Sequence, residues 1–256
     1  MFVDTHAHIY LDDFKADLDE VINNAVDQSI GRIYMPNIDS TSIDDMMEVE
    51  NRYPDSTFSM MGLHPCSVKK NFEKELYTVE DWLGKRKFVG LGEIGTDLYW
   101  DKTFWEQQKE ALRIQLRLAA SYHIPAIIHC RESIDETIEI IEKEKTDQLC
   151  GIFHCFTGSV IQAEKIIKLG FKIGIGGVST FKNGGLDLVI PDIELTDIVL
   201  ETDSPYLAPV PFRGKRNMPS YITLVAERVA ELKGIPIEQL EESTTELANR
   251  LFDYGK

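Results

Sequence analysis

The sequence is poor in the features that mark exported, membrane-spanning or disulfide-stabilised proteins. It has only four cysteines, and none of them forms a C-x-x-C pair. No apolar run approaches the about 18 residues that a membrane-spanning helix requires, and no basic, apolar leader precedes Asp4. We therefore expect a cytoplasmic protein with reduced thiols and no association with membranes.

Positive charge is also scarce. Lys and Arg number 27 against 43 Asp and Glu, which gives a formal net charge of −16. This balance argues against a broad basic surface for a polyanion. It leaves room for a local cationic site, because bound metal ions are often the largest charges in a pocket and reverse its field locally.

What the sequence does contain is a regular alternation of short apolar runs with longer segments whose apolar residues recur every three or four positions. The segments 104–122 and 160–170 are typical of amphipathic helices. Alternation of strands and helices indicates parallel pairing through crossover helices. The eight apolar runs are 2–8, 31–37, 57–64, 87–95, 125–131, 150–156, 171–177 and 197–203.

Eight repeats predict an α/β fold, a (β/α)8 TIM barrel, as a single domain over residues 1–256. A helical C-terminus is expected from about Pro219 to Phe252. An open, doubly wound sheet is the structural alternative, and the length would also allow two small domains. We take one domain as the expectation, because barrels of this length fold as one.

Five of the six histidines stand at or near the ends of these apolar runs. The chain opens with D-T-H-A-H, and on a strand His6 and His8 lie on the same side. In a parallel barrel the C-terminal strand ends converge on one mouth, so distant positions become neighbours. The remaining histidine, His123, follows a predicted helix and is expected to sit at its C-terminus.

The polar residues at these ends form a set that exceeds the needs of one tetrahedral zinc ion. Two divalent ions fit better, with Glu93 bridging them. Zinc, manganese and iron suit mixed imidazole and carboxylate ligands, and magnesium would suit the carboxylates. The predicted ligands are His6, His8, Glu93, His129, His154 and Asp203.

Further residues are candidates for catalysis and for contact with a phosphate. Asp203 is expected to act as both ligand and general base, while Glu201, deeper on the same face, positions a ligand or caps a network. The loop 211–217 carries Lys215 and Arg216, which together with Arg131 could neutralise a phosphate at the mouth. His64 is expected near the mouth as a contact to phosphate or leaving oxygen.

Three other patterns have more than one interpretation. Tyr99, Trp100 and Phe156 could stack a base, although aromatic residues near barrel ends more often pack loops. Cys130 and Cys155 each follow a predicted ligand and are therefore expected to face outward as small apolar fillers. The glycines at 174–177 lack the spacing of a dinucleotide loop and indicate close backbone approach.

Taken together, seven ordered motifs resemble the TatD-type metal-dependent deoxyribonucleases of the amidohydrolase superfamily. This resemblance runs from Asp4 to about Asn249, and it implies a (β/α)8 barrel with a dinuclear metal centre. It also implies hydrolysis of DNA phosphodiesters from a strand end, and its motifs carry the same six ligands. The motifs are DTHAHIYLDDF, GLHP, GEIGTDLYW, IIHCRES, FHCFTGS, ETDSPYLAP and RGKRN.

The leading hypothesis is therefore a deoxyribonuclease that acts on single-stranded DNA ends through a metal-bridging hydroxide, with two ions drawn from Mg, Mn or Zn. His64, Arg131 and Lys215 would steady the phosphate. The alternative is ester or amide hydrolysis, as in a D-aminoacyl-tRNA deacylase. A non-catalytic, metal-dependent interaction module would need a closed ligand sphere, which this set of residues does not favour.

Overall fold

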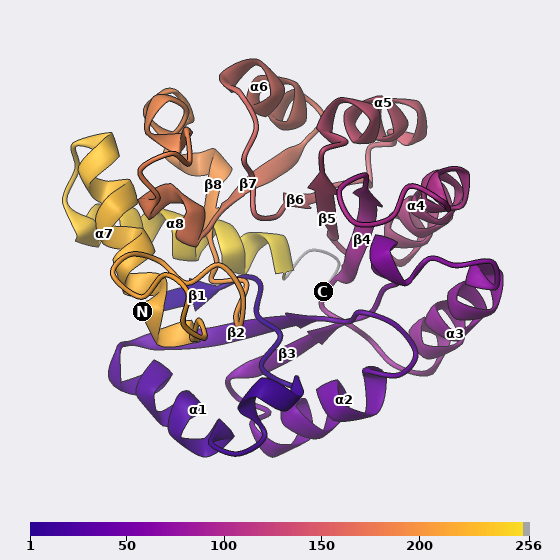
Figure 1. Ribbon diagram of the computed structural model, residues 1–256, viewed down its shortest axis with the longest axis horizontal. Helices are drawn as coiled ribbons and strands as arrows, with labels where there is room; N and C mark the ends of the chain where they lie inside the picture. The colour runs from indigo at the N-terminus through magenta and orange to yellow at the C-terminus, as the bar shows by residue number, and fades with distance from the viewer. Residues whose placement is uncertain (253–256) are drawn as a thin grey trace.

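The computed structural model describes residues 1–252, in which eight parallel strands form a ring that is surrounded by helices (Figure 1). The strands are β1 Phe2–Asp4, β2 Ile30–Pro36, β3 Thr57–Met60, β4 Leu91–Asp97, β5 Ala126–Arg131, β6 Gly151–Phe153, β7 Phe171–Ile175 and β8 Ile198–Leu200. Each strand overlaps one of the eight apolar runs: β2 begins one residue before its run, β4 ends two residues after its run, and the others lie within theirs.

The ring is closed by contacts between two sheets, one of order β1-β2-β3 and one of order β4-β5-β6-β7-β8. Met61, just after β3, bridges Leu91 of β4, and Ala7 bridges Ser204 beyond β8. The Thr5 amide also donates to the Leu200 carbonyl at 3.1 Å. The (β/α)8 barrel is therefore confirmed, and the open, doubly wound sheet is not.

Helices cover the outside of the ring. They are α1 Leu18–Asp27, α2 Ile43–Arg52, α3 Phe72–Lys85, α4 Trp105–Tyr122, α5 Ile134–Glu144, α6 Val160–Lys168, α7 Ile222–Lys233 and α8 Ile237–Phe252. The predicted helices at 104–122 and 160–170 match α4 and α6 closely. His123 caps the C-terminus of α4 with φ of 54°, as expected of its position. Within residues 1–252, no helix combines the length and apolarity that a membrane crossing requires.

The predicted helical C-terminus closes one end of the barrel. Leu247, Leu251 and Phe252 of α8 join an apolar cluster that includes side chains from six strands. The Phe252 ring stacks on Tyr34 of β2, with 3.8 Å between ring centroids. Helix α8 lies across the ring on the far side in Figure 1, so a polar site on the barrel axis can open only at the opposite end.

Candidate metal centre

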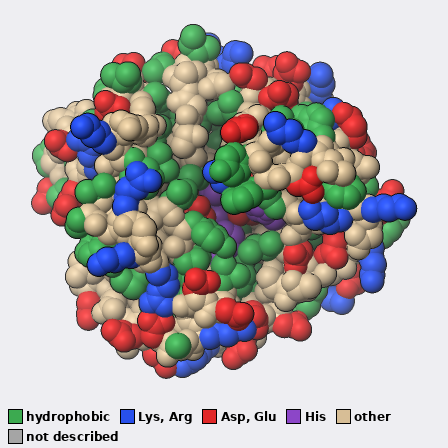
Figure 2. Space-filling view, viewed as in Figure 1, with side chains coloured by type: hydrophobic (Ala, Val, Ile, Leu, Met, Phe, Trp, Pro, Cys, Tyr) green, Lys and Arg blue, Asp and Glu red, His purple; other side chains and the backbone are tan. Residues whose placement is uncertain are grey.

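The C-terminal ends of the strands surround a cavity of about 820 Å³. Figure 2 shows histidines at the bottom of this hollow, with many apolar side chains around its opening. Five histidines and four carboxylates lie in or directly beneath it, as the strand-end pattern predicts. The cavity lining includes His8, His64, Glu93, Asp97, His129, His154 and Asp203.

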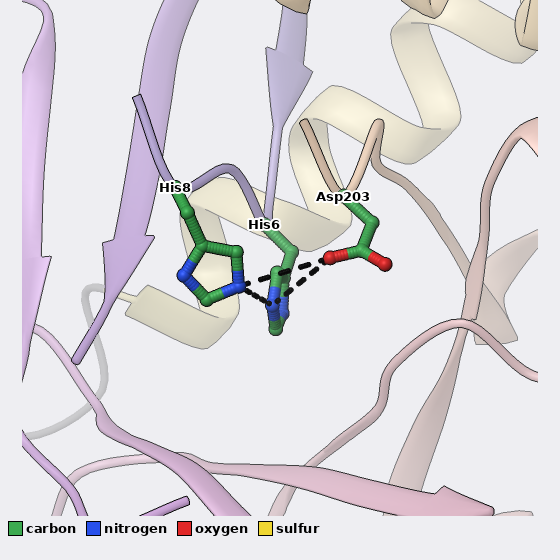
Figure 3. Close-up of side chains that lie close together, drawn as sticks. All are labelled: His6, His8 and Asp203. Atoms are coloured by element: carbon green, nitrogen blue, oxygen red, sulfur yellow. Dashed lines mark hydrogen bonds and ion pairs between the residues drawn. The ribbon is translucent and has the colours of Figure 1, made fainter. Parts of the chain in front are cut away.

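The first cluster joins residues that follow the first and the last strand of the barrel. Nε2 of His6 lies 3.1 Å from Nε2 of His8, and Oδ1 of Asp203 lies 3.8 and 3.7 Å from these two nitrogens (Figure 3). The Asp203 amide donates to the His6 carbonyl at 2.8 Å, which fixes the carboxylate beside the histidines. These three side chains can therefore hold one ion.

Glu93 lies between this cluster and a second one. Its Oε2 is 3.3 Å from Nε2 of both His6 and His8. Its Oε1 is 2.8 Å from Nδ1 of His129 and 2.8 Å from Nε2 of His154. Burial would raise the pKa of Glu93, but the surrounding histidines outweigh it and hold that pKa well below its usual range. An ionised carboxylate with one oxygen toward each pair has the geometry of a bridging ligand.

Neighbouring groups determine which ring nitrogen of each histidine is unprotonated and therefore able to bind a metal ion. The Tyr10 hydroxyl donates to the Pro36 carbonyl at 2.6 Å, so it can only accept from Nδ1 of His8, 2.9 Å away. The proton of His8 then resides on Nδ1, and the Nε2 lone pair faces Glu93. A tyrosine thus does for His8 what carboxylates commonly do for metal-binding histidines.

Carboxylates orient the histidines of the second cluster. Oδ2 of Asp97 accepts from Nε2 of His129 at 3.0 Å, and Oε1 of Glu201 lies 3.5 Å from Nδ1 of His154. Burial would raise the pKa of Asp97, but the His129 bond and two backbone amides lower it to about 2. The other ring nitrogens, Nδ1 of His129 and Nε2 of His154, face Glu93.

A cation fits among these atoms. Nδ1 of His129 and Nε2 of His154 are 3.3 Å apart, and both lie 2.8 Å from the same Glu93 oxygen. In neutral imidazoles with the outer nitrogens protonated, all three atoms are acceptors, so only protons or a metal ion can lie between them. Burial lowers the pKa of His154, but Glu93 and Glu201 raise it well above its usual value. A divalent ion would displace such protons.

His64 has the opposite arrangement. The backbone amide of Cys66 donates to Nδ1 of His64 at 3.0 Å, and burial lowers the pKa of this imidazole. The neutral ring therefore carries its proton on Nε2, which lies 3.2 Å from Oε1 of Glu93. Position alone would let His64 join a metal cluster with Glu93 and His129, but its inward nitrogen is a hydrogen-bond donor.

Glu201 lies beneath the cavity and is fully buried. Its Oε1 accepts from the Cys155 amide and lies 3.5 Å from Nδ1 of His154, so the carboxylate stands behind this histidine and outside the cavity lining. The predicted close approach at 174–177 is confirmed here, because a Cβ atom on Gly174 would lie 2.5 Å from Oε2 of Glu201. The smallest residue therefore leaves room for this carboxylate.

The predicted phosphate contacts are only partly brought to the mouth. Arg131 lines the cavity, whereas Lys215 and Arg216 do not. Nη2 of Arg216 pairs with the Asp17 carboxylate at 2.6 Å, and Nζ of Lys215 lies 5.9 Å from the centroid of the Phe212 ring. The expectation that Arg216 overhangs the mouth needs correction, since the Asp17 carboxylate draws its guanidinium toward α1.

Two further sequence expectations also need correction. Cys130 packs partly against the core, but it lines the cavity together with Cys155. Cys155 lies two residues beyond the end of β6 and has φ of 45°, so strand alternation no longer predicts where its side chain points. Phe156 is 2% exposed and belongs to the apolar core, so it cannot stack a base.

Asp97 and Tyr10 contact the candidate ligands His129 and His8, and the sequence argument missed both. Asp97 lies four residues after Glu93 on β4, and Tyr10 lies two residues after His8. An even spacing from a predicted ligand was therefore the available signal for both. Asp4, two residues before His6, accepts from the His6 amide at 3.3 Å and from the Thr202 amide at 2.9 Å, so it holds backbone rather than a histidine ring.

The comparisons with known proteins agree on one family. A family model described as TatD related DNase matches residues 3–253. The metal-dependent hydrolase YabD of Bacillus subtilis is 39% identical over 253 residues, which cover 98% of this chain and 99% of YabD. The crystal structure of YjjV, a TatD homologue from Escherichia coli, superimposes with a TM-score of 0.93 at 29% identity and covers 98% of both chains.

Proposed function

The chain belongs to the TatD-related DNase family of metal-dependent hydrolases, and from this premise we propose that it cleaves phosphodiester bonds of DNA, beginning at single-stranded ends. The observation that carries the proposal is the position of Glu93 between two pairs of histidines. We further propose that residues 1–256 act as one domain, and that the four free cysteines belong to a cytoplasmic protein.

The proposed metal ligands are the six predicted from the sequence. The donor atoms of His6, His8 and Asp203 would hold one divalent ion and those of His129 and His154 a second, with Glu93 shared between them. Magnesium, manganese and zinc remain the candidate ions. When bound, two such ions supply Lewis acidity toward a phosphate oxygen and make water a stronger acid.

The protein itself supplies hydrogen bonds and proton transfer. The inward N–H of His64 can donate to a phosphate oxygen or to the leaving oxygen. The Asp203 carboxylate faces the cavity as well as the histidine pair, so it can accept a proton from the attacking water. Glu201 has the role of a positioning residue for His154 rather than that of an acid or base.

Preference for strand ends follows from the shape and charge of the site. The cavity lies on the barrel axis, and Arg131 is the one Lys or Arg among its lining residues within the described chain. A chain of charge −16 repels DNA elsewhere on its surface. A short footprint with few phosphate contacts suits a single strand that enters end first.

The proposal is tested by giving the purified protein manganese or magnesium and measuring hydrolysis of a linear single strand and of an aminoacyl-tRNA in parallel. We expect nucleotide release from DNA and a much slower release of amino acid. Asp203→Asn is the matched control, because it removes a ligand and the proposed base together. Rapid deacylation with intact DNA would replace this proposal by ester hydrolysis.

A further inference from the structure

One edge of the cavity carries exposed aromatic side chains that the metal centre does not use. Trp100 is 68% exposed and Tyr99 is 48% exposed, and both lie in the loop between β4 and α4. The guanidinium carbon of Arg131 lies 3.7 Å from the centroid of the Tyr99 ring and 5.5 Å from that of Trp100. We call these three residues the aromatic rim.

The aromatic rim is held in place by the same carboxylate that orients His129. Oδ1 of Asp97 accepts from the Tyr99 amide at 2.8 Å and from the Trp100 amide at 2.9 Å, while Oδ2 accepts from His129. The Tyr99 and Trp100 rings meet edge to face at 89°, with 4.9 Å between centroids. These contacts fix the rim relative to the second metal cluster before any ligand arrives.

Arg131 gives the aromatic rim a positive charge. No carboxylate within residues 1–252 forms an ion pair with Arg131, although acidic residues greatly outnumber basic ones. Arginine side chains that stack on a ring keep their N–H donors free for an anion. An exposed indole beside an unpaired guanidinium offers both a flat apolar face and an anion-binding group.

We propose that the aromatic rim is a nucleobase-stacking subsite, in which the base next to the scissile phosphate stacks on Trp100 while Arg131 donates to a flanking phosphate. This inference rests on the proposed function and names the substrate class that fits it: unpaired nucleotides at a strand end, whose bases are free to leave a stack. Every base has a π-face, so the subsite selects unpaired bases without selecting their identity.

The first test measures binding without turnover. The protein is stripped of metal with EDTA and titrated against an end-labelled ten-nucleotide strand of thymidines. The anisotropy of the label gives the affinity of every variant, and tryptophan fluorescence is followed in parallel. We expect quenching in the natural protein, binding weakened about ten-fold or more in Trp100→Ala, and near-normal binding in Trp100→Phe. Tyr77→Ala is the matched control, because Tyr77 is 72% exposed on α3, does not line the cavity and should leave binding unchanged.

The second test measures cleavage by the metal-loaded protein on strands in which one base at a time is removed to leave an abasic sugar. One position near the scissile bond should slow cleavage by the natural protein about ten-fold. Trp100→Ala should be slow on the intact strand and lose nothing further from that abasic position. Equal cleavage of all strands by the natural protein would overturn the subsite while leaving the nuclease proposal in place.

The two proposals fail in different ways. If Trp100→Ala abolishes the quenching and the metal-loaded natural protein cleaves no phosphodiester, the stacking subsite is supported and the nuclease proposal is overturned. Quenching of equal size and affinity in the natural protein and Trp100→Ala would place the binding at another tryptophan, and would overturn the subsite.

Discussion

The backbone amide of Cys66 donates to Nδ1 of His64 at 3.0 Å, and this one bond separates His64 from the other histidines of the cavity. It leaves a proton on the nitrogen that faces Glu93, where the neighbouring histidines His129 and His154 present lone pairs. The hydrogen-bond partner of each histidine therefore decides whether it presents a proton or a lone pair to Glu93, and this difference can be tested.

We expect His64→Ala to keep its metal and lose activity. Removing one donor to a developing charge typically lowers turnover about 10²–10³-fold. His129→Ala should lose metal instead, because its Nδ1 faces the shared Glu93 oxygen. Elemental analysis after saturation and desalting checks both, with up to two ions expected in the natural protein. Equal metal loss in the two variants would make His64 a ligand.

Asp97→Asn should weaken metal binding about 10–100-fold, the usual effect of removing an orienting group behind a metal ligand. The Asn amide oxygen can still accept from Tyr99 and Trp100, while the group that faces His129 no longer accepts a proton. Isothermal titration with manganese measures the affinity. Asp101→Asn in the same loop is the control, since Asp101 pairs with Lys69 on the surface. An unchanged affinity in Asp97→Asn would mean that His129 needs no such partner.

Binding of single-stranded DNA should depend only weakly on salt. With Arg131 as the cation in the cavity lining, the slope of log K against log salt should correspond to about one to three phosphates. Arg131→Gln should reduce the slope by about one, and Lys215→Gln should leave it unchanged. Fluorescence anisotropy at several salt concentrations gives these values. A slope above about six would reveal a phosphate-coating surface elsewhere on the protein.

A cleavage assay tests whether the protein requires a strand end. An end-labelled linear strand should be degraded, whereas a covalently closed single-stranded circle should persist. Equal rates on the two substrates would remove the end requirement and leave an endonuclease.

Gly95→Ala should destabilise the barrel strongly. Gly95 has φ of 147°, and an added Cβ would lie 1.9 Å from the His129 carbonyl oxygen. Strain and overlap together should lower the free energy of unfolding by about 3 kcal/mol or more. Gly84→Ala, in α3 with no atom within 4 Å of its added Cβ, should raise it by about 0.5 kcal/mol. Urea unfolding compares the two, and a small loss in Gly95→Ala would show that β4 can yield.

Strand-end position was enough to predict the architecture and to bring His6, Glu93, His129 and Asp203 to one place. Parallel strands of a closed barrel share one mouth, so a short polar residue at a strand end has little choice of position. The ring nitrogens that bind were not predictable, because they depend on partners such as Tyr10 and Asp97 that meet the ring only after folding.

The positions of charged side chains on loops were harder to predict from the sequence. Arg216 belongs to a basic run that suggests a phosphate site, yet its nearest carboxylate comes from Asp17, about two hundred positions away in the chain. A long charged side chain on a loop is placed by whichever opposite charge the fold brings near, and the local sequence does not contain that information. Arg131, at the end of a strand, has less freedom and does reach the cavity.

The closure of the ring also sets when this chemistry can begin. His6 and His8 precede their neighbours Asp203 and Ser204 by about two hundred positions, so they are synthesised well before them. A nascent chain that lacks β8 holds histidines without the carboxylate that joins them. The full ligand set can therefore assemble only after Asp203 has been synthesised, and a product truncated before β8 would lack the complete centre.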